Sequence, residues 1–227
     1  MSTHAPSAAA TSPRPWLRWA VLATALLAGV GAGLAVAILH GSRASTDTAL
    51  TAVGRPDAAW PAGARLAPDF RLRDQNGLPI SLRSLRGRPV ILTFIDPLCR
   101  NLCPLEAQVL NDVVRRSAPQ ARPAVVAVSV NPWGNARANL RLDAQKWRLA
   151  SGWRWAVGPY GRLAEVWRRY DIGVRVTRKT IAGITVRDVV HTEAAYVIDP
   201  SGYQRALFVY PYHAGDVVRT VRGLSPR

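Results

Sequence analysis

Hydrophobic and polar positions divide the chain into an uncharged N-terminal stretch and a longer part where short apolar runs alternate with helical patterns. Residues 19–39 contain no charged side chain, and a length of about 20 apolar residues suits a helix that crosses a bilayer. Arginines precede this stretch, and no acidic residue occurs before Asp47. The positive-inside rule therefore predicts a disordered cytosolic tail at 1–15, a single-pass anchor in the cell (inner or plasma) membrane at 16–40, and an exported remainder.

Two other interpretations of the apolar stretch stay open. A cleaved signal peptide fits because Gly and Ala dominate, and a mitochondrial transit peptide fits because the tail contains Ser and lacks acidic residues. The stretch is longer than the apolar region of about 7–15 residues usual in signal peptides, and little sequence precedes it for a transit peptide. We therefore expect an uncleaved anchor, followed by a flexible tether over 41–65 that is rich in Gly, Ala, Ser, Thr and Pro.

From residue 66 to 227 the pattern predicts an α/β domain with a central parallel pair of strands. Continuous apolar runs predict buried strands, and apolar residues every three or four positions predict helices. The expected strands cover 90–95, 124–130, 194–198 and 206–210, and the expected helices cover 104–117, 135–150, 160–170 and 216–224. A turn at 74–77 predicts one hairpin, and alternation over 173–190 predicts an inserted hairpin that turns at Ala182-Gly183.

The chain has two cysteines, Cys99 and Cys103, between the predicted strand 90–95 and a helix that begins near Pro104. The positive end of the helix dipole favours thiolate over thiol at such a position. Thiolates are soft ligands that select Cu(I), with Zn(II) as a competitor. The pair could instead exchange disulfides with a partner or form an inert disulfide, although a disulfide that closes so short a loop stabilises a fold little.

A third metal ligand would come from one of four histidines. His4 lies in the tail, His40 lies at the end of the anchor, and His213 precedes the last predicted helix. His191 stands at the start of the predicted strand 194–198, and the ends of such strands border the main crevice of an α/β sheet. His191 is therefore the candidate ligand, while a structural role for it stays open.

The formal net charge of +16 comes almost entirely from arginine. The basic residues are spread over the exported part rather than clustered with aromatic residues, and no nucleic-acid-binding module is recognisable. We therefore expect no nucleic-acid partner. Attraction to anionic lipid headgroups, or a compositional bias towards arginine, explains the charge better.

The motifs of the domain resemble two related groups of proteins. The opening segments, Ala67-Pro68-Asp69-Phe70 and Leu85-Arg86-Gly87, resemble thioredoxin-like redoxins. The set Cys99-x₃-Cys103-Pro104, His191-Thr192 and Tyr196-Val197-Ile198-Asp199-Pro200-Ser201-Gly202 resembles the Sco/SenC family, over about residues 66–224. This resemblance implies a thioredoxin-like fold behind a membrane anchor, with Cys99, Cys103 and His191 as copper ligands.

The same resemblance implies a function and partners. The protein would deliver Cu(I) to the binuclear copper site of cytochrome c oxidase, or would reduce the cysteines of that site. Its partners would be the copper-bearing oxidase subunit or another cuproprotein, membrane lipid through the anchor, and a thiol–disulfide reductant. The alternatives are a metal-independent thiol–disulfide oxidoreductase acting through Cys99 and Cys103, and a non-catalytic interaction domain.

Two departures from the family pattern bear on these alternatives. Arg100 and Asn101 stand where the family often has Pro and Asp, and we expect the charge of Arg100 to lower the thiol pKa values and to disfavour an added cation. This favours disulfide exchange over metal transfer. A peroxidase of the peroxiredoxin type is disfavoured because Asp96, rather than Thr, stands three residues before Cys99. Asp143 has no assigned role.

Overall fold

The computed structural model of the protein describes residues 54–224. The predicted tail, the predicted anchor, His4, His40 and most of the predicted tether lie outside the described residues. Among the helices within 54–224, none combines the length and the apolar character that crossing a membrane requires.

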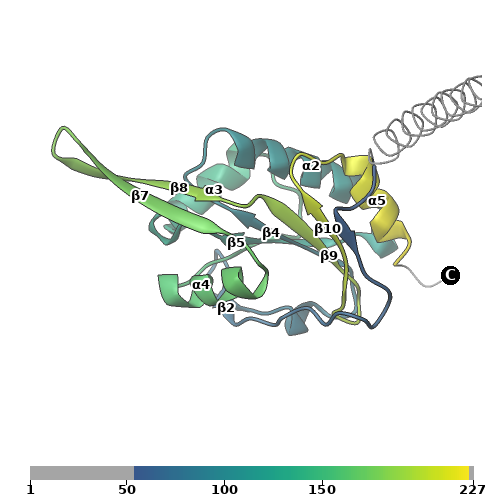
Figure 1. The fold of residues 1–227 in the computed structure, drawn as a ribbon. Helices are drawn as coiled ribbons and strands as arrows, with labels where there is room; N and C mark the ends of the chain where they lie inside the picture. The colour runs from purple at the N-terminus through teal and green to yellow at the C-terminus, as the bar shows by residue number, and fades with distance from the viewer. Residues whose placement is uncertain (1–53, 225–227) are drawn as a thin grey trace, which may run out of the picture. The chain divides into compact units, whose positions relative to one another are not determined.

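A mixed sheet of six strands forms the centre of the described domain (Figure 1). The strand order is β1 (Ala58–Ala59), β10 (Gln204–Val209), β9 (Ala194–Ile198), β4 (Val90–Ile95), β5 (Ala124–Ser129) and β6 (Trp153–Ala156). Strands β4, β5 and β6 are parallel, whereas β9, β10 and β1 join by antiparallel pairing. The parallel centre is as predicted, but β1 and β6 were not predicted. Strand β1 lies within the stretch 41–65 that the sequence assigns to the tether.

Helices cover both faces of the sheet (Figure 1). On one face lie α2 (Leu102–Arg116), α3 (Arg137–Lys146) and α5 (Ala214–Arg222), and on the other lie α4 (Tyr160–Arg169) and the small hairpin of β2 (Leu72–Arg73) and β3 (Pro79–Ile80). Short 3₁₀ helices occur at η1 (Arg83–Leu85), η2 (Pro119–Ala121) and η3 (Pro132–Gly134). All four predicted helices and the predicted hairpin around 74–77 are present, with ends that differ by a few residues.

The continuous apolar runs follow from burial of the sheet on both faces. All six residues of β4 are buried. Because successive strand side chains point to opposite faces, Ile91 and Ile95 pack in the cluster under α2, whereas Leu92 and Phe94 pack in the cluster under α4. A run with no polar alternation is therefore what a central strand between two helical layers requires.

The predicted inserted hairpin is the part of the domain that projects furthest from the sheet (Figure 1). It consists of β7 (Val174–Ile181) and β8 (Ile184–His191), and Ala182 and Gly183 form its turn with positive φ angles of 51° and 80°. Such a two-residue turn matches the twist of the paired strands. His191 is the last residue of β8, not the start of the core strand as expected, because β9 begins only at Ala194.

Candidate metal and thiol site

A tight turn at the end of β4 positions the cysteines. The Cys99 amide donates to the Asp96 carbonyl oxygen at 3.1 Å, and the Leu98 amide donates to the Asp96 carboxylate at 2.7 Å. The side chain of Asn101 then accepts from the Leu102 amide at 2.9 Å and caps α2. Helix α2 thus begins earlier than predicted, and Cys103 lies in its first turn.

The two thiols differ in exposure although they are adjacent. Cys103 is fully buried, whereas Cys99 is half-buried, and the two form no disulfide. The Cys103 amide points at the Cys99 sulfur, with the nitrogen 3.4 Å from Sγ. The Cys99 sulfur also lies 2.9 Å from Oδ1 of Asn101. The less buried sulfur, that of Cys99, therefore lies at the helix N-terminus, and the fully buried sulfur of Cys103 lies behind it.

His191 meets Cys103 from the hairpin. Nε2 of His191 lies 3.7 Å from Sγ of Cys103, and its Nδ1 lies 3.1 Å from the Thr192 carbonyl oxygen. A carbonyl at Nδ1 holds the proton there and leaves Nε2 free to act as a ligand. The half-buried carboxylate of Glu193 also lies 3.7 Å from the Cys103 sulfur. Sequence reasoning did not identify Glu193, although its position two residues after His191 was a usable signal.

Of the three predicted ligands, the structure brings Cys103 and His191 directly together. Potential ligand atoms of Cys103, His191 and Glu193 all lie within 4.8 Å of one another. Cys99 is not in that group but adjoins it through the Cys103 amide. A soft ion such as Cu(I) favours sulfur and imidazole over a carboxylate, whereas a harder ion accepts the carboxylate.

The helix N-terminus does not act equally on the two thiols. The pKa of Cys99 is lowered to about 6, chiefly because the Cys103 thiol donates a hydrogen bond to its thiolate and also because backbone amides point at it. The pKa of Cys103 is raised, because deprotonation would lose that hydrogen bond and because the side chain is buried. The expectation of favoured thiolates therefore holds for Cys99 and fails for Cys103.

The guanidinium of Arg100 is engaged with the backbone of the cysteine loop and with α3, and Arg100 is not among the groups that shift the pKa of either thiol, contrary to expectation. Its Nη1 lies 3.4 Å from the buried Asp143 carboxylate on α3 and donates to the carbonyl oxygens of Pro97 and Cys99 at 3.1 and 2.9 Å. The ion pair with Asp143 joins the guanidinium to α3. Asp143 therefore has a structural role that the sequence left unassigned, which is to tie the cysteine loop to the neighbouring helix.

A buried carboxylic acid lies one helical turn beyond Cys103. Glu106 is fully buried, and its Oε1 accepts from the hydroxyls of Thr93 and Tyr212 at 2.8 and 2.9 Å. Burial raises its pKa to about 7 despite these hydrogen bonds. Glu106 was not among the predicted site residues, although it falls on the inward face of α2 that contains Cys103 and Leu110.

The hairpin continues the surface of the site. Val174 pairs with His191, and Arg178 pairs with Arg187 further along, so these residues share one face of the hairpin. The Arg187 guanidinium lies 4.7 Å from the ring centroid of Trp133. The same face borders a cleft of about 350 Å³, lined by Trp133, Tyr160, Val176 and Arg178. An aromatic and basic surface thus adjoins the candidate site.

A thioredoxin-like fold with a thiol pair at a helix N-terminus, faced by a histidine from an inserted hairpin, defines a class of redox or metal-handling domains. The sequence model of the SCO1/SenC family matches residues 59–225. The chain belongs to this family. No curated protein matches the chain by sequence.

Solved structures of Sco proteins share the fold. Copper-bound ScoI from Bradyrhizobium japonicum aligns with a TM-score of 0.60 at 20% identity, covering 70% of this chain and 99% of that one. Copper-bound yeast Sco1 aligns with a TM-score of 0.61 at 18% identity, covering 70% and 87%. BsSco, a member of the Sco family of cytochrome c oxidase assembly proteins with a disulfide switch, aligns with a TM-score of 0.57 at 18% identity, covering 75% and 97%.

Proposed function

We propose that this protein is a membrane-anchored assembly factor that carries Cu(I) on Cys99, Cys103 and His191 outside the cytosol. The observation that carries the proposal is the approach of His191 Nε2 to within 3.7 Å of Cys103 Sγ, with Cys99 Sγ at the Cys103 amide. Two thiolates and an imidazole are the donor set that suits Cu(I). The client would be the copper-bearing subunit of cytochrome c oxidase, as the family's role in oxidase assembly suggests.

The different pKa values and exposures of the two cysteines determine how Cu(I) would bind and how a client would remove it. Cys99 with a pKa of about 6 is ready as a thiolate at neutral pH, whereas Cys103 must release a proton when the ion binds. Cu(I) affinity should therefore fall as the pH falls. Because Cys99 is the more exposed sulfur, a thiolate from the client would replace ligands from that side.

Cu(I) competition against a chromogenic chelator tests this ligand set, with the full-length protein in a neutral detergent. We expect one Cu(I) per chain, and a loss of affinity of at least about a hundredfold for Cys99→Ser, Cys103→Ser and His191→Ala, more than loss of an outer-shell partner costs. His213→Ala is the matched control and should bind as the wild type does. Wild-type affinity in His191→Ala would refute the proposal.

The variant Glu193→Gln distinguishes the proposed ligand set from the alternative set in which Glu193 replaces Cys99. The variant should keep Cu(I) within a few-fold, because a soft ion gains little from a carboxylate oxygen. If Glu193→Gln loses Cu(I) while Cys99→Ser keeps it, the ligands are Cys103, His191 and Glu193 instead.

The split between the thiol pKa values favours a second candidate function, thiol–disulfide exchange. The Cys99 thiolate would attack a client disulfide, forming a mixed disulfide and releasing one client thiolate. Cys103 would lose its proton and attack Cys99, releasing the second client thiolate, so that the client is reduced by two electrons and the pair is oxidised. A separate thiol reductant would regenerate the pair.

Trapping tests this second function. Cys103→Ser should accumulate a mixed disulfide at Cys99 with a model peptide disulfide, and Cys99→Ser should not. Turnover on the peptide that is unchanged by a Cu(I) chelator would make exchange the main activity, whereas failure of Cys103→Ser to trap any adduct would exclude it.

A further inference from the structure

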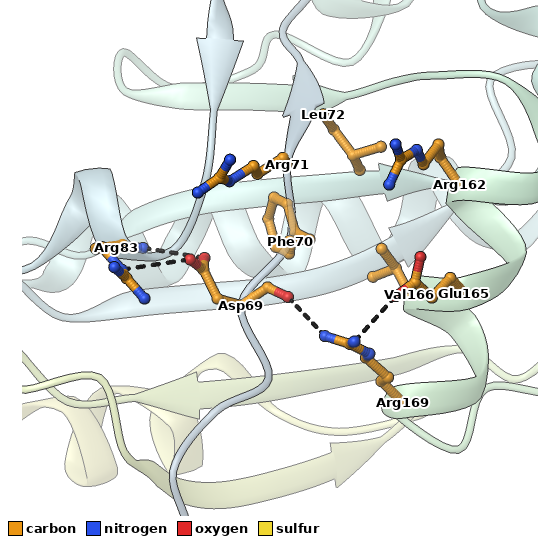
Figure 2. A pocket seen from close by; sticks show the side chains of 9 residues that line it. All are labelled: Asp69, Phe70, Arg71, Leu72, Arg83, Arg162, Glu165, Val166 and Arg169. Atoms are coloured by element: carbon orange, nitrogen blue, oxygen red, sulfur yellow. Dashed lines mark hydrogen bonds and ion pairs between the residues drawn. The ribbon is translucent and has the colours of Figure 1, made fainter.

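A second hollow lies on the α4 side of the sheet, and none of the candidate site residues lines it. Its volume is about 280 Å³, and it opens between the segment around Asp69–Leu72, which leads into β2, and helix α4. Figure 2 shows the side chains that surround it. Four arginines and two acidic residues line it, an excess of two positive charges: Arg71, Arg83, Arg162, Arg169, Asp69 and Glu165.

Each carboxylate in this hollow already has an arginine partner. Arg83 approaches the Asp69 carboxylate at 3.6 Å, and Arg169 approaches the Glu165 carboxylate at 2.9 Å (Figure 2). Arg169 also donates to the Asp69 carbonyl oxygen at 3.2 Å, which joins the β2 side to α4. These two arginines are therefore engaged in holding the walls together.

Arg71 and Arg162 carry the excess charge. Neither forms an ion pair with any residue between 54 and 224. They come from different elements and both line the hollow, and Figure 2 shows them on either side of Leu72. Two guanidinium groups that line one hollow without a carboxylate partner suit an oxyanion with several acceptor oxygens, such as phosphate.

The floor of the hollow is apolar and continues beyond the arginines. Phe70, Leu72 and Val166 are 5–7% exposed and lie beneath the charged groups. A neighbouring hollow of about 440 Å³ shares Arg71, Leu72 and Arg162 and extends to Arg73, Pro79, Val157, Gly158 and Pro159. The two hollows together place guanidinium groups beside an apolar surface at Leu72, Pro79, Val157 and Pro159.

We propose that this basic cleft, defined by Arg71, Arg162 and the apolar floor at Phe70 and Leu72, binds a phosphate-bearing amphiphile. The phosphate would accept hydrogen bonds from Arg71 and Arg162, and the first carbons of the chain would lie on Leu72 and towards Val157. An anionic phospholipid has this chemistry, and free phosphate shares only its head. This proposal is independent of copper binding, because the cleft contains no predicted copper ligand.

Calorimetric titration of the full-length protein in neutral detergent tests the cleft with a short-chain lipid, dihexanoylphosphatidylglycerol. We expect saturable binding at one site, weakened at least about tenfold in Arg71→Gln/Arg162→Gln, since the variant removes two charge-assisted contacts. The matched control is Arg141→Gln/Arg222→Gln, which removes two exposed arginines from α3 and α5 that form no ion pair within the described domain. The control should bind as the wild type does.

Titrations with three other ligands show whether the cleft binds a phospholipid or free phosphate. Dihexanoylphosphatidylcholine should bind at least about tenfold more weakly, because its choline cation faces the arginines. Glycerol phosphate and inorganic phosphate should also bind more weakly, because they leave the apolar surface at Leu72, Val157 and Pro159 uncovered. If either binds as tightly as the lipid, the amphiphile is wrong and the site is for free phosphate. If the control double variant loses as much affinity as Arg71→Gln/Arg162→Gln, the attraction is general and no built site exists.

Discussion

The two sides of the candidate copper site are built very differently. The cysteine side rests on β4 and α2, where the strand is buried throughout and Cys103 is part of the core. On the histidine side, His191 is the last residue of the β7–β8 hairpin, and both strands of this hairpin are mostly exposed. At its tip, the side chains of Ile181 and Ile184 are 60% and 68% exposed. The positions of the two sulfurs therefore depend on the stability of the domain core, whereas the position of the imidazole depends on the pairing register of one hairpin.

The largest expected effect is on the free energy of unfolding, and two isoleucine-to-alanine substitutions, one in the core and one in the hairpin, test it. Ile91→Ala removes a fully buried side chain under α2 and should lower the free energy of unfolding by about 2–5 kcal/mol. Ile184→Ala at the hairpin tip should change it by no more than about 0.5 kcal/mol. Urea unfolding followed by tryptophan fluorescence measures both, and similar losses would show that the hairpin contributes to the core.

The buried side chain of Glu106 should make the free energy of unfolding depend on pH, by nearly as much as the Ile91→Ala substitution changes it. The pKa of Glu106 is raised from 4.5 to about 7, so the folded state holds its proton more tightly than the unfolded state does. Its contribution is complete below about pH 4.5 and is lost as the pH rises through about 7, amounting to on the order of 3 kcal/mol. Glu106→Gln should lose less stability than the wild type between pH 5 and pH 8, as measured by urea unfolding. Parallel curves for the two proteins would contradict this.

The two thiols on the cysteine side should react at very different rates. At pH 7, iodoacetamide should modify Cys99 at least about a hundredfold faster than Cys103, because Cys99 is a partly exposed thiolate and Cys103 is a buried thiol. The rate at Cys99 should rise with pH to half its plateau near pH 6. Mass spectrometry of digests measures each site, and the same reaction in urea should remove the difference.

The smallest expected effect concerns the start of α2. Asn101→Ala removes the oxygen that caps the Leu102 amide and should cost about 1 kcal/mol of stability. Asn101→Asp keeps the cap, so its stability should match the wild type, but its negative charge should raise the pKa of Cys99. Unfolding and alkylation measurements on both variants separate the two roles of this side chain, and an unchanged alkylation profile in Asn101→Asp would contradict the second.

Structural features that depend on consecutive residues could be predicted from the sequence, whereas features that depend on residues far apart in the chain could not. The strand at 90–95 and the hairpin turn at Ala182-Gly183 could be predicted, because burial on both faces and turn geometry leave marks in consecutive residues. Strand β6 was missed because it is four residues long and has the exposed Arg154 within it. The short edge strand β1 gave no pattern at all.

The site was less accessible to local reasoning. Cys103 and His191 are 88 positions apart, and only the resemblance to a family joined them before the structure did. The environment of Glu106 depends on the hydroxyl of Tyr212, which comes from the far end of the chain. The orientation of Arg100 depends on Asp143 from another helix. Charges whose partners are distant in sequence cannot be assigned from spacing alone.

The pairing of Val174 with His191 at the base of the hairpin limits how this segment can evolve. Side chains on a strand alternate between faces, so a slip of one position would turn the imidazole to the opposite side of the ribbon. Insertions or deletions at the tip are therefore tolerated when they add or remove a residue from each strand together. Relatives of this protein can differ widely in the length of the ribbon, provided that the change keeps the histidine on the face that meets the sulfurs.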